Sequence, residues 1–221
     1  MPLNWSPLWL SLRVASIATA ISLAVGIYLA YVLANRTFRG RELLDAAVTL
    51  PLTLPPTVLG YYLLVLIGQR SPLGQAYQWL FHAPLVFTWQ AAVLASTIHA
   101  IPLLVRTARA ALLSVDHNLE RAARTLGASE WRLFWRITLP LTRRSLIAAT
   151  VLAFARSLGD FGTTLMIAGD IPGRTQTVSI AIYDAVESGD TTTAQVLVLV
   201  ISALTITIVW LANRLETQAH A

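Results

Sequence analysis

The sequence predicts an all-α integral membrane protein with about five transmembrane helices. Of its 221 residues, 56% are hydrophobic and only 12% are charged, whereas a soluble domain carries about 25% charged residues. The mean hydropathy is +0.63. Apolar runs recur at the length of about 20 residues that a helix needs to cross the hydrocarbon core of a bilayer. We expect one membrane domain over residues 1–221, with spans at 14–34, 46–68, 83–105, 145–168 and 193–212.

The distribution of arginine predicts how these spans are oriented. The chain has no lysine, so all sixteen basic residues are arginine. Twelve of them fall in three predicted loops on one side of the membrane, 35–45, 106–144 and 213–221. The predicted loops on the other side, 69–82 and 169–192, carry Arg70 and Arg174 only. Because basic loops stay in the cytoplasm, we expect the N-terminus to lie outside. We also expect the net charge of +5 to reflect orientation in the lipid bilayer and not binding of nucleic acid.

The first two apolar runs each allow a second interpretation. A cleavable signal peptide has its basic residues before the apolar run, but here Arg36, Arg39 and Arg41 follow it, and only Arg13 precedes it. We therefore expect a true span. The second run contains Pro55 and Pro56, and proline kinks or breaks a helix. Such a helix survives in a membrane where it packs against protein or lines a cavity, so Pro55 and Pro56 either belong to a kinked packing helix or are candidates for lining a pathway.

The central loop, residues 106–144, separates the third and fourth spans and carries eight arginines. It predicts two short helices, 119–126 and 130–137, that are joined at Gly127. Ser129 is a suitable N-cap for the second helix, and Leu139-Pro140 is expected to end it. The loop holds more apolar side chains than a solvated loop needs. It either docks on a partner or lies on the membrane surface as an amphipathic pair.

The central loop resembles the conserved loop of permease subunits of bacterial ABC importers. The matching positions are Ala122, Ala123, Gly127, Ile137, Leu139 and Pro140. Arg121 stands where that pattern has glutamate, and Glu120 precedes it, a variant that is similar to the molybdate and sulfate branch. The resemblance implies that Glu120 and these six residues couple the membrane helices to a separate ATP-binding subunit. An ATPase P-loop needs a lysine, so we expect no enzymatic activity in this chain.

Two charges lie within the predicted fourth span. Arg156 and Asp160 are four residues apart and share a helix face. A charge at the bilayer centre costs about 2.5–3.5 kcal/mol, so both should face protein or water. They either form an ion pair that fixes helix packing, or Arg156 presents positive potential to a passing oxyanion. His99 in the third span is expected to be a hydrogen-bonded packing residue, and a ligand role is the alternative.

The predicted outer segment 169–192 offers a surface to a partner outside the membrane. Gly169, Pro172 and Gly173 predict a turn, and Thr175 or Thr177 can cap a short helix over 178–187. The positive end of such a helix attracts anions, but the segment can equally plug the outer face or dock a binding protein. The candidates for docking are Asp170, Pro172, Gly173 and Arg174.

A second resemblance covers almost all of the chain from Arg36 onward. The stretches LTLPPTVLGYYLL, FARSLGDFGTTLMIAGDIPGRTQT and SIAIY are similar to the molybdate permeases of ABC importers. This resemblance implies a homodimer in the bacterial inner membrane, two ATP-binding subunits and a periplasmic molybdate-binding protein, with tungstate as a second substrate and neither cofactor nor metal site. A sulfate or thiosulfate permease is the alternative within the family.

Two other classes of membrane protein remain open from the residues alone. A proton-coupled secondary transporter can use His99, Arg156 and Asp160 as a relay, but it does not need the two helices of the central loop. A scaffold that transports nothing can use that loop, but it does not need buried charges.

Overall fold

The computed structural model describes residues 4–217, and within that range the chain forms helices and turns without a strand. The helices are α1 Ser6–Asn35, α2 Arg41–Thr53, α3 Pro56–Ile67, α4 Pro72–Phe81, α5 Trp89–Leu113, α6 His117–Thr125, α7 Glu130–Leu133, the π-helix η1 Phe134–Thr138, α8 Leu139–Leu158, α9 Gly162–Ala168, α10 Val178–Glu187 and α11 Thr191–Thr217.

The described residues contain four stretches that are long and apolar enough to cross a membrane, and a bent pair supplies a fifth. The four are Ser6–Asn35, Trp89–Leu113, Glu130–Leu158 and Thr191–Leu211, and the bent pair is α2 with α3. The predicted fold class, an all-α membrane protein with about five spans, is therefore confirmed.

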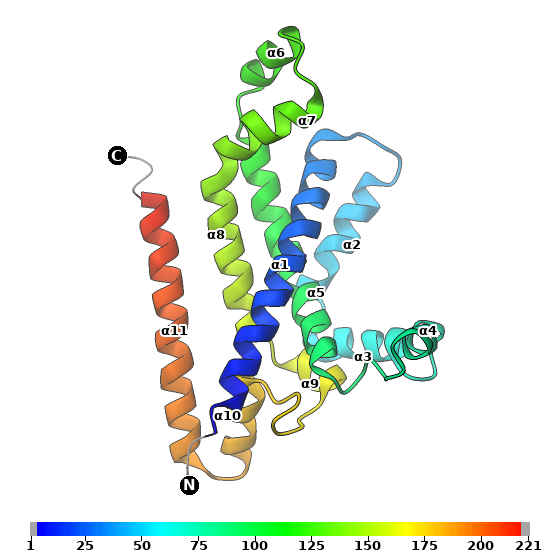
Figure 1. The fold of residues 1–221 in the computed structure, drawn as a ribbon, viewed down its shortest axis with the longest axis vertical. Helices are drawn as coiled ribbons and strands as arrows, with labels where there is room; N and C mark the ends of the chain where they lie inside the picture. The colour runs from blue at the N-terminus through cyan, green and yellow to red at the C-terminus, as the bar shows by residue number, and fades with distance from the viewer. Residues whose placement is uncertain (1–3, 218–221) are drawn as a thin grey trace.

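Helices α1, α5 and α8 form the centre of the bundle, and α11 lies along α8 at its edge (Figure 1). Small side chains let these helices approach closely, as is usual between membrane helices. Ala30 of α1, Ala100 and Ala108 of α5, and Ala149 and Ala153 of α8 are all fully buried.

The arginine-rich loops gather at one end of the bundle. The turn between α1 and α2, the central loop and the end of α11 lie at the top of Figure 1, whereas α9, α10 and the start of α1 lie at the bottom. This arrangement supports the predicted cytoplasmic side, and the orientation across the bilayer stays a prediction.

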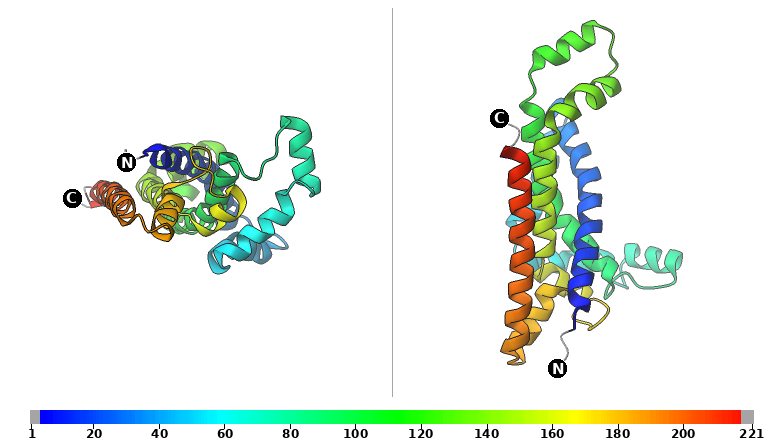
Figure 2. Two further views of the ribbon diagram at one scale, coloured as in Figure 1. Left: turned by 90° about the horizontal axis from the view of Figure 1, so that it is seen from below. Right: turned by 60° about the vertical axis from the view of Figure 1, so that its left-hand side comes forward.

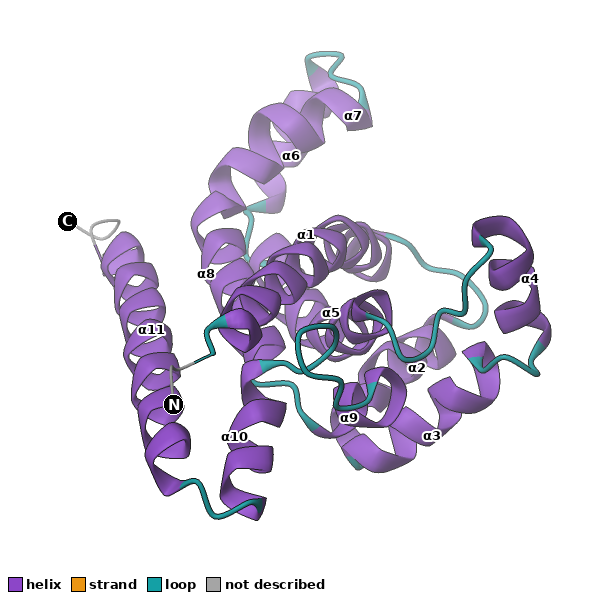
Figure 3. Cartoon of the chain, turned by 60° about the horizontal axis from the view of Figure 1, so that its bottom comes forward, coloured by secondary structure: helices purple, strands orange, loops and turns teal. Residues whose placement is uncertain are grey.

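The helix pair in the predicted second span is broken rather than kinked. The chain bends by 117° between α2 and α3. Leu54, which precedes Pro55, has an extended backbone, as expected for a residue before proline, whereas Pro51 stays inside α2. Helix α3 consequently runs sideways across the bundle beside α9, and α4 projects beyond it (Figures 2 and 3).

The second short helix of the central loop does not end at Leu139-Pro140, so that expectation is wrong. Helix α7, η1 and α8 follow one another without a break from Glu130 to Leu158. Pro140 lies in the first turn of α8, directly after the π-helical turn η1. The regular i→i−4 pattern is already interrupted there, so the missing N–H of Pro140 does not end the helix.

The limits of the other helices also differ from the predicted spans: α1 already starts at Ser6, and α11 extends from Thr191 to Thr217. The helix in the third span starts at Trp89, where Thr88 accepts a hydrogen bond from the backbone N–H of Ala91, and it continues to Leu113. The helix in the fourth span ends at Leu158, and α9 begins after a break at residues 159–161. Asp160 at this break has its two shortest polar contacts outside α8, as described next.

Candidate functional site

The two breaks in the membrane helices lie against each other. Thr163 of α9 donates a hydrogen bond from Oγ1 to the carbonyl oxygen of Pro56, at 2.9 Å. A Cβ on Gly162 would lie 2.9 Å from the Cβ of Pro56, and a Cβ on Gly60 would lie 2.6 Å from that of Met166. Glycine at both positions is therefore needed for α3 and α9 to approach this closely.

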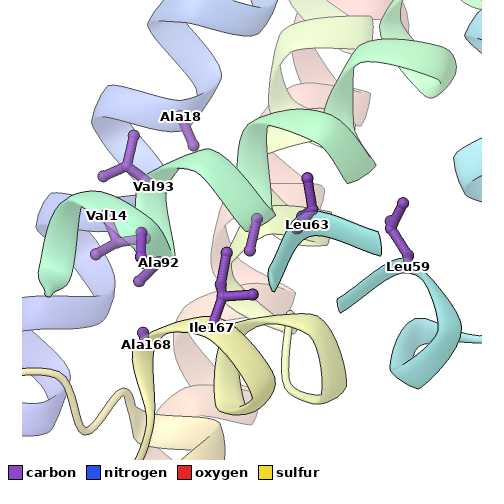
Figure 4. Close-up of a cluster of buried hydrophobic side chains, with 10 residues drawn as sticks. Val14, Ala18, Leu59, Leu63, Ala92, Val93, Ile167 and Ala168 are labelled. Carbon is purple, nitrogen blue, oxygen red and sulfur yellow. The ribbon is translucent and has the colours of Figure 1, made fainter. Parts of the chain in front are cut away.

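A buried apolar cluster holds the two breaks against the bundle. Figure 4 shows side chains from four helices that meet there: Val14 and Ala18 of α1, Leu59 and Leu63 of α3, Ala92 and Val93 of α5, and Ile167 and Ala168 of α9. The pathway candidates from the second span, Pro55 and Pro56, thus come from an element that packs on α9, directly after the candidate Asp160.

Asp160 is the centre of a buried polar cluster. Its carboxylate Oδ1 lies 2.9 Å from Nδ1 of His99 and 3.7 Å from a terminal nitrogen of Arg156. Its Oδ2 accepts a hydrogen bond from Oγ1 of Thr164, at 2.6 Å. The predicted pairing of Arg156 with Asp160 is confirmed, but at a distance that makes it the longest of the three contacts.

The cluster is unevenly exposed. The side chains of His99 and Asp160 are each 2% exposed, whereas that of Arg156 is 34% exposed. Nδ1 of His99 is in close contact with Oδ1 of Asp160, but the two groups are not aligned for a hydrogen bond. A buried carboxylate needs such partners because an unpaired charge is costly in a low dielectric.

Sequence reasoning found part of this cluster. The spacing of Asp160 and Thr164, four residues apart, carries the same signal that was used for Arg156 and Asp160. The partnership of His99 with Asp160 joins α5 to the break after α8, and no spacing in the sequence reveals a contact between separate helices.

The turn in the central loop explains the glycine of the motif. Gly127 has φ +78°, a region that other residues rarely adopt. The N–H of Gly127 donates to the carbonyl of Arg124, and that of Ala128 donates to the carbonyl of Ala123, both at 3.0 Å. These two bonds form a Schellman motif, which ends α6 and turns the chain. The predicted N-cap is confirmed, because Ser129 accepts a hydrogen bond from the N–H of Arg132.

Glu120 faces the inside of the central loop. Its side chain is 9% exposed, and its carboxylate accepts a hydrogen bond of 3.5 Å from Oγ1 of Thr138. A terminal nitrogen of Arg124 also lies 3.5 Å from it. Glu120 therefore joins α6 to η1, the turn that leads into α8.

A second ion pair braces the two short helices. Arg124 donates hydrogen bonds of 2.7 and 3.2 Å to the carboxylate of Glu130. This hydrogen bonding raises the pKa of Arg124 above its ordinary value.

The tip of the central loop presents apolar side chains to its surroundings. Leu126 is 87% exposed and Trp131 is 73% exposed. Among the other motif residues, Ala122 and Pro140 are exposed, Ala123 is buried, and Ile137 and Leu139 are half-buried. Exposed apolar groups next to fixed charges suit a protein partner better than water.

The outer segment forms a tight turn followed by α10, at the predicted limits 178–187. The backbone N–H groups of Arg174, Thr175 and Gln176 all donate to the carbonyl of Ile171. The docking candidates Asp170, Pro172, Gly173 and Arg174 are exposed on this turn.

The capping predicted for α10 is only half right. Thr177 occupies the N-cap position, but its side chain makes no capping bond. Ser11 of α1 caps the helix instead, accepting from the N–H of Val178 at 2.7 Å.

Comparisons with known proteins agree with this geometry. Residues 22–219 match the family described as "Binding-protein-dependent transport system inner membrane component". The "Molybdenum transport system permease protein ModB" of Escherichia coli (strain K12) is 46% identical over 95% of this chain and 94% of its own. The "Putative molybdenum transport system permease protein YvgM" of Bacillus subtilis is 39% identical over 97% of this chain and 94% of its own.

A more distant relative and a solved structure extend the comparison. The "Probable sulfate transport system permease protein cysT" of Marchantia polymorpha is 33% identical over 91% of this chain and 70% of its own. A chain in the crystal structure of a bacterial alginate ABC transporter, in complex with an alginate pentasaccharide-bound periplasmic protein, superposes with a TM-score of 0.79. That superposition covers 99% of this chain and 80% of the other at 16% identity, so it shows the fold.

The match over nine-tenths of the chain, the apolar helices and the structured central loop agree on one assignment. The chain is a transport subunit, a multi-pass permease of the bacterial inner membrane, and its kinds of partner are ATP-hydrolysing and substrate-binding subunits. It belongs to the family of binding-protein-dependent transport system inner membrane components.

Proposed function

We propose that this permease imports molybdate, with tungstate as a second substrate, and that it works as a homodimer with two ATP-binding subunits and a periplasmic molybdate-binding protein. The observation that carries the proposal is the 46% identity to a molybdenum permease over nearly the full length of both chains. The relative named for sulfate is 33% identical, so sulfate is the weaker alternative.

The central loop would carry the coupling. In this proposal, Glu120, Ala122, Ala123, Gly127, Ile137, Leu139 and Pro140 transmit closure of the ATP-binding subunits to the membrane helices. The exposed Leu126 and the tie from Glu120 to Thr138 support it, because one gives the partner a surface and the other joins that surface to α8. Residues 1–221 would act as a single domain.

Within the polar cluster, Arg156 would face the substrate. Arg156, beside the two helix breaks, supplies positive potential to the oxyanion as it passes, and Pro55 and Pro56 shape the pathway. Helix breaks at membrane depth line substrate routes in other transporters. The outer turn at Asp170, Pro172, Gly173 and Arg174 would receive the binding protein.

Uptake of radiolabelled molybdate into proteoliposomes that contain the permease and its ATP-binding subunit, with binding protein outside, tests the substrate. We expect ATP-dependent uptake that tungstate inhibits and that an equal excess of sulfate leaves nearly unchanged. Inhibition by sulfate as strong as by tungstate would move the assignment to the sulfate branch.

Coupling has its own test in the ATPase activity of the same complex. We expect that loaded binding protein stimulates hydrolysis and that Gly127→Pro abolishes the stimulation, because proline cannot adopt positive φ. A wild-type chain with which no ATPase co-purifies would overturn the proposal.

A further inference from the structure

We propose that His99 is a positioning residue for substrate recognition: by holding the carboxylate of Asp160, it keeps the guanidinium of Arg156 available to the oxyanion. This inference rests on the proposed function, since it assumes that Arg156 meets the anion. It adds a residue from α5 whose role no spacing in the sequence indicates.

The carboxylate of Asp160 divides its contacts unevenly among its neighbours. The atoms that lie close to it belong to His99, at 2.9 Å, and to Thr164, at 2.6 Å. The nitrogen of Arg156 is 3.7 Å away, beyond the usual length of about 2.7–2.9 Å for a charge-assisted hydrogen bond. Asp160 is therefore satisfied mainly by groups other than Arg156.

This division of contacts keeps Arg156 out of a close pair with Asp160. A carboxylate four residues away on a helix is the nearest trap for an arginine, and a bidentate pair would occupy the guanidinium. Nδ1 of His99 is in contact with Oδ1 and Thr164 donates to Oδ2, so each oxygen already has a close polar neighbour other than Arg156. Arg156 keeps a nearby negative charge that lowers the cost of its burial, but most of its donors remain unused.

The guanidinium of Arg156 is also the exposed part of the cluster. Arg156 is the one member of the four-residue cluster with a substantially exposed side chain, at 34%, whereas Thr164 is 1% exposed. His99 and Asp160 are sealed among α5, α8 and α9. Only the guanidinium can meet a substrate, so the buried members act through it.

Removing His99 should therefore weaken substrate affinity without touching substrate. In His99→Leu, the freed Oδ1 of Asp160 becomes the best partner for Arg156, and the arginine turns inward. We expect the KM for molybdate uptake to rise about tenfold, the size of one charge-assisted hydrogen bond, with kcat and basal ATPase activity nearly unchanged. His99→Gln, whose amide can still donate to Asp160, should stay within about twofold of wild type.

The double variant His99→Leu/Asp160→Asn separates positioning from packing. Neutralising Asp160 removes the trap for Arg156, so the KM should return toward that of Asp160→Asn alone. The matched control is Thr97→Val, which also removes a buried polar group from α5, a hydroxyl that donates to the carbonyl of Val93 within the same helix. Its KM should equal that of wild type.

The outcomes distinguish this inference from the proposed function. If the wild-type complex imports no molybdate, the proposed function fails. If it imports molybdate and His99→Leu leaves the KM unchanged, or raises it equally with and without Asp160→Asn, the positioning role is overturned. Should His99→Leu fail to assemble, the comparison of Asp160→Asn with His99→Leu/Asp160→Asn decides: equal KM values support the role, and different values overturn it.

Discussion

Thr163 and Pro56 join two helix breaks that are more than one hundred residues apart in sequence. The hydroxyl of Thr163 donates to the carbonyl of Pro56 at 2.9 Å, and Thr163 is fully buried. Pro56 is the first residue of α3, so its carbonyl is also placed to accept the helical hydrogen bond from four residues on. The hydroxyl of Thr163, the second residue of α9, adds a bond that ties the two helices together.

Thr163→Val should destabilise the junction of α3 and α9. Valine keeps the volume but removes the donor, so the junction loses one hydrogen bond, at a net cost of about 0.5–1.5 kcal/mol. We expect a lower unfolding temperature of the purified complex and slower substrate uptake. Thr150→Val is the matched control, because the hydroxyl of Thr150 donates to Leu146 within its own helix. Equal unfolding temperatures for the two variants would contradict the prediction.

Gly60→Ala should damage the same junction through space rather than through a hydrogen bond. Its new Cβ would lie 2.6 Å from the Cβ of Met166, an atom next to the backbone of α9, so the helices must separate. Gly26→Ala is the comparison, since its Cβ would meet the terminal Cδ2 of Leu104 at 2.7 Å, and that side chain can rotate away. We expect Gly60→Ala to lose most uptake and Gly26→Ala to keep most, and the reverse order would refute this account.

The sequence alone predicts the parts of this molecule that depend on local patterns. Apolar runs locate the spans, because the bilayer sets their length. The spacing of Arg156 and Asp160 predicts their pairing, because a helix repeats every 3.6 residues. Ser129 is recognisable as an N-cap for the same reason, since its partner lies only three residues away.

The parts that the sequence does not reveal depend on contacts between separate elements. Leu139-Pro140 signals the end of a helix, but the π-helical turn of η1 lets the chain continue into α8. The cap of α10 comes from Ser11, 167 residues away. His99 and Glu120 acquire their partners only when α5 meets the break after α8 and when α6 folds back on η1.

Gly127→Ala should weaken the central loop without removing any side-chain contact. Positive φ costs a residue with a Cβ about 1–2 kcal/mol, so the Schellman turn that follows α6 becomes less populated. We expect reduced stimulation of the ATP-binding subunit by loaded binding protein, and a milder effect for Gly127→Asn because asparagine tolerates this backbone region.

Gly40→Ala provides the control for that backbone effect. Gly40 also has positive φ, at +93°, and like Gly127 it has open space where a Cβ would stand. It lies in the turn between α1 and α2, outside the proposed coupling residues. A loss of stimulation in Gly40→Ala as large as in Gly127→Ala would show that the central loop has no special role in coupling.

Asp170 should give the outer turn a dependence on pH. Partial burial raises the pKa of Asp170 above its ordinary value, opposed by a hydrogen bond from Gln176 and reinforced by the charge of Asp184. Because the folded protein favours the protonated acid, the stabilisation is complete below the unfolded pKa and is lost as pH rises through the folded pKa. Asp170→Asn should therefore unfold at a higher temperature than wild type near neutral pH, and this difference should vanish in acid.

Asp190 offers a control of opposite sign for the same measurement. A hydrogen bond with Thr193 lowers the pKa of Asp190, so its contribution is present above the unfolded pKa and is lost as pH falls. Unfolding temperatures recorded from about pH 3 to pH 7, a range that spans ordinary carboxyl pKa values, should show Asp190→Asn below wild type at neutral pH. If Asp170→Asn also falls below wild type there, the charge at Asp170 stabilises the turn, and partial burial is not what dominates its pKa.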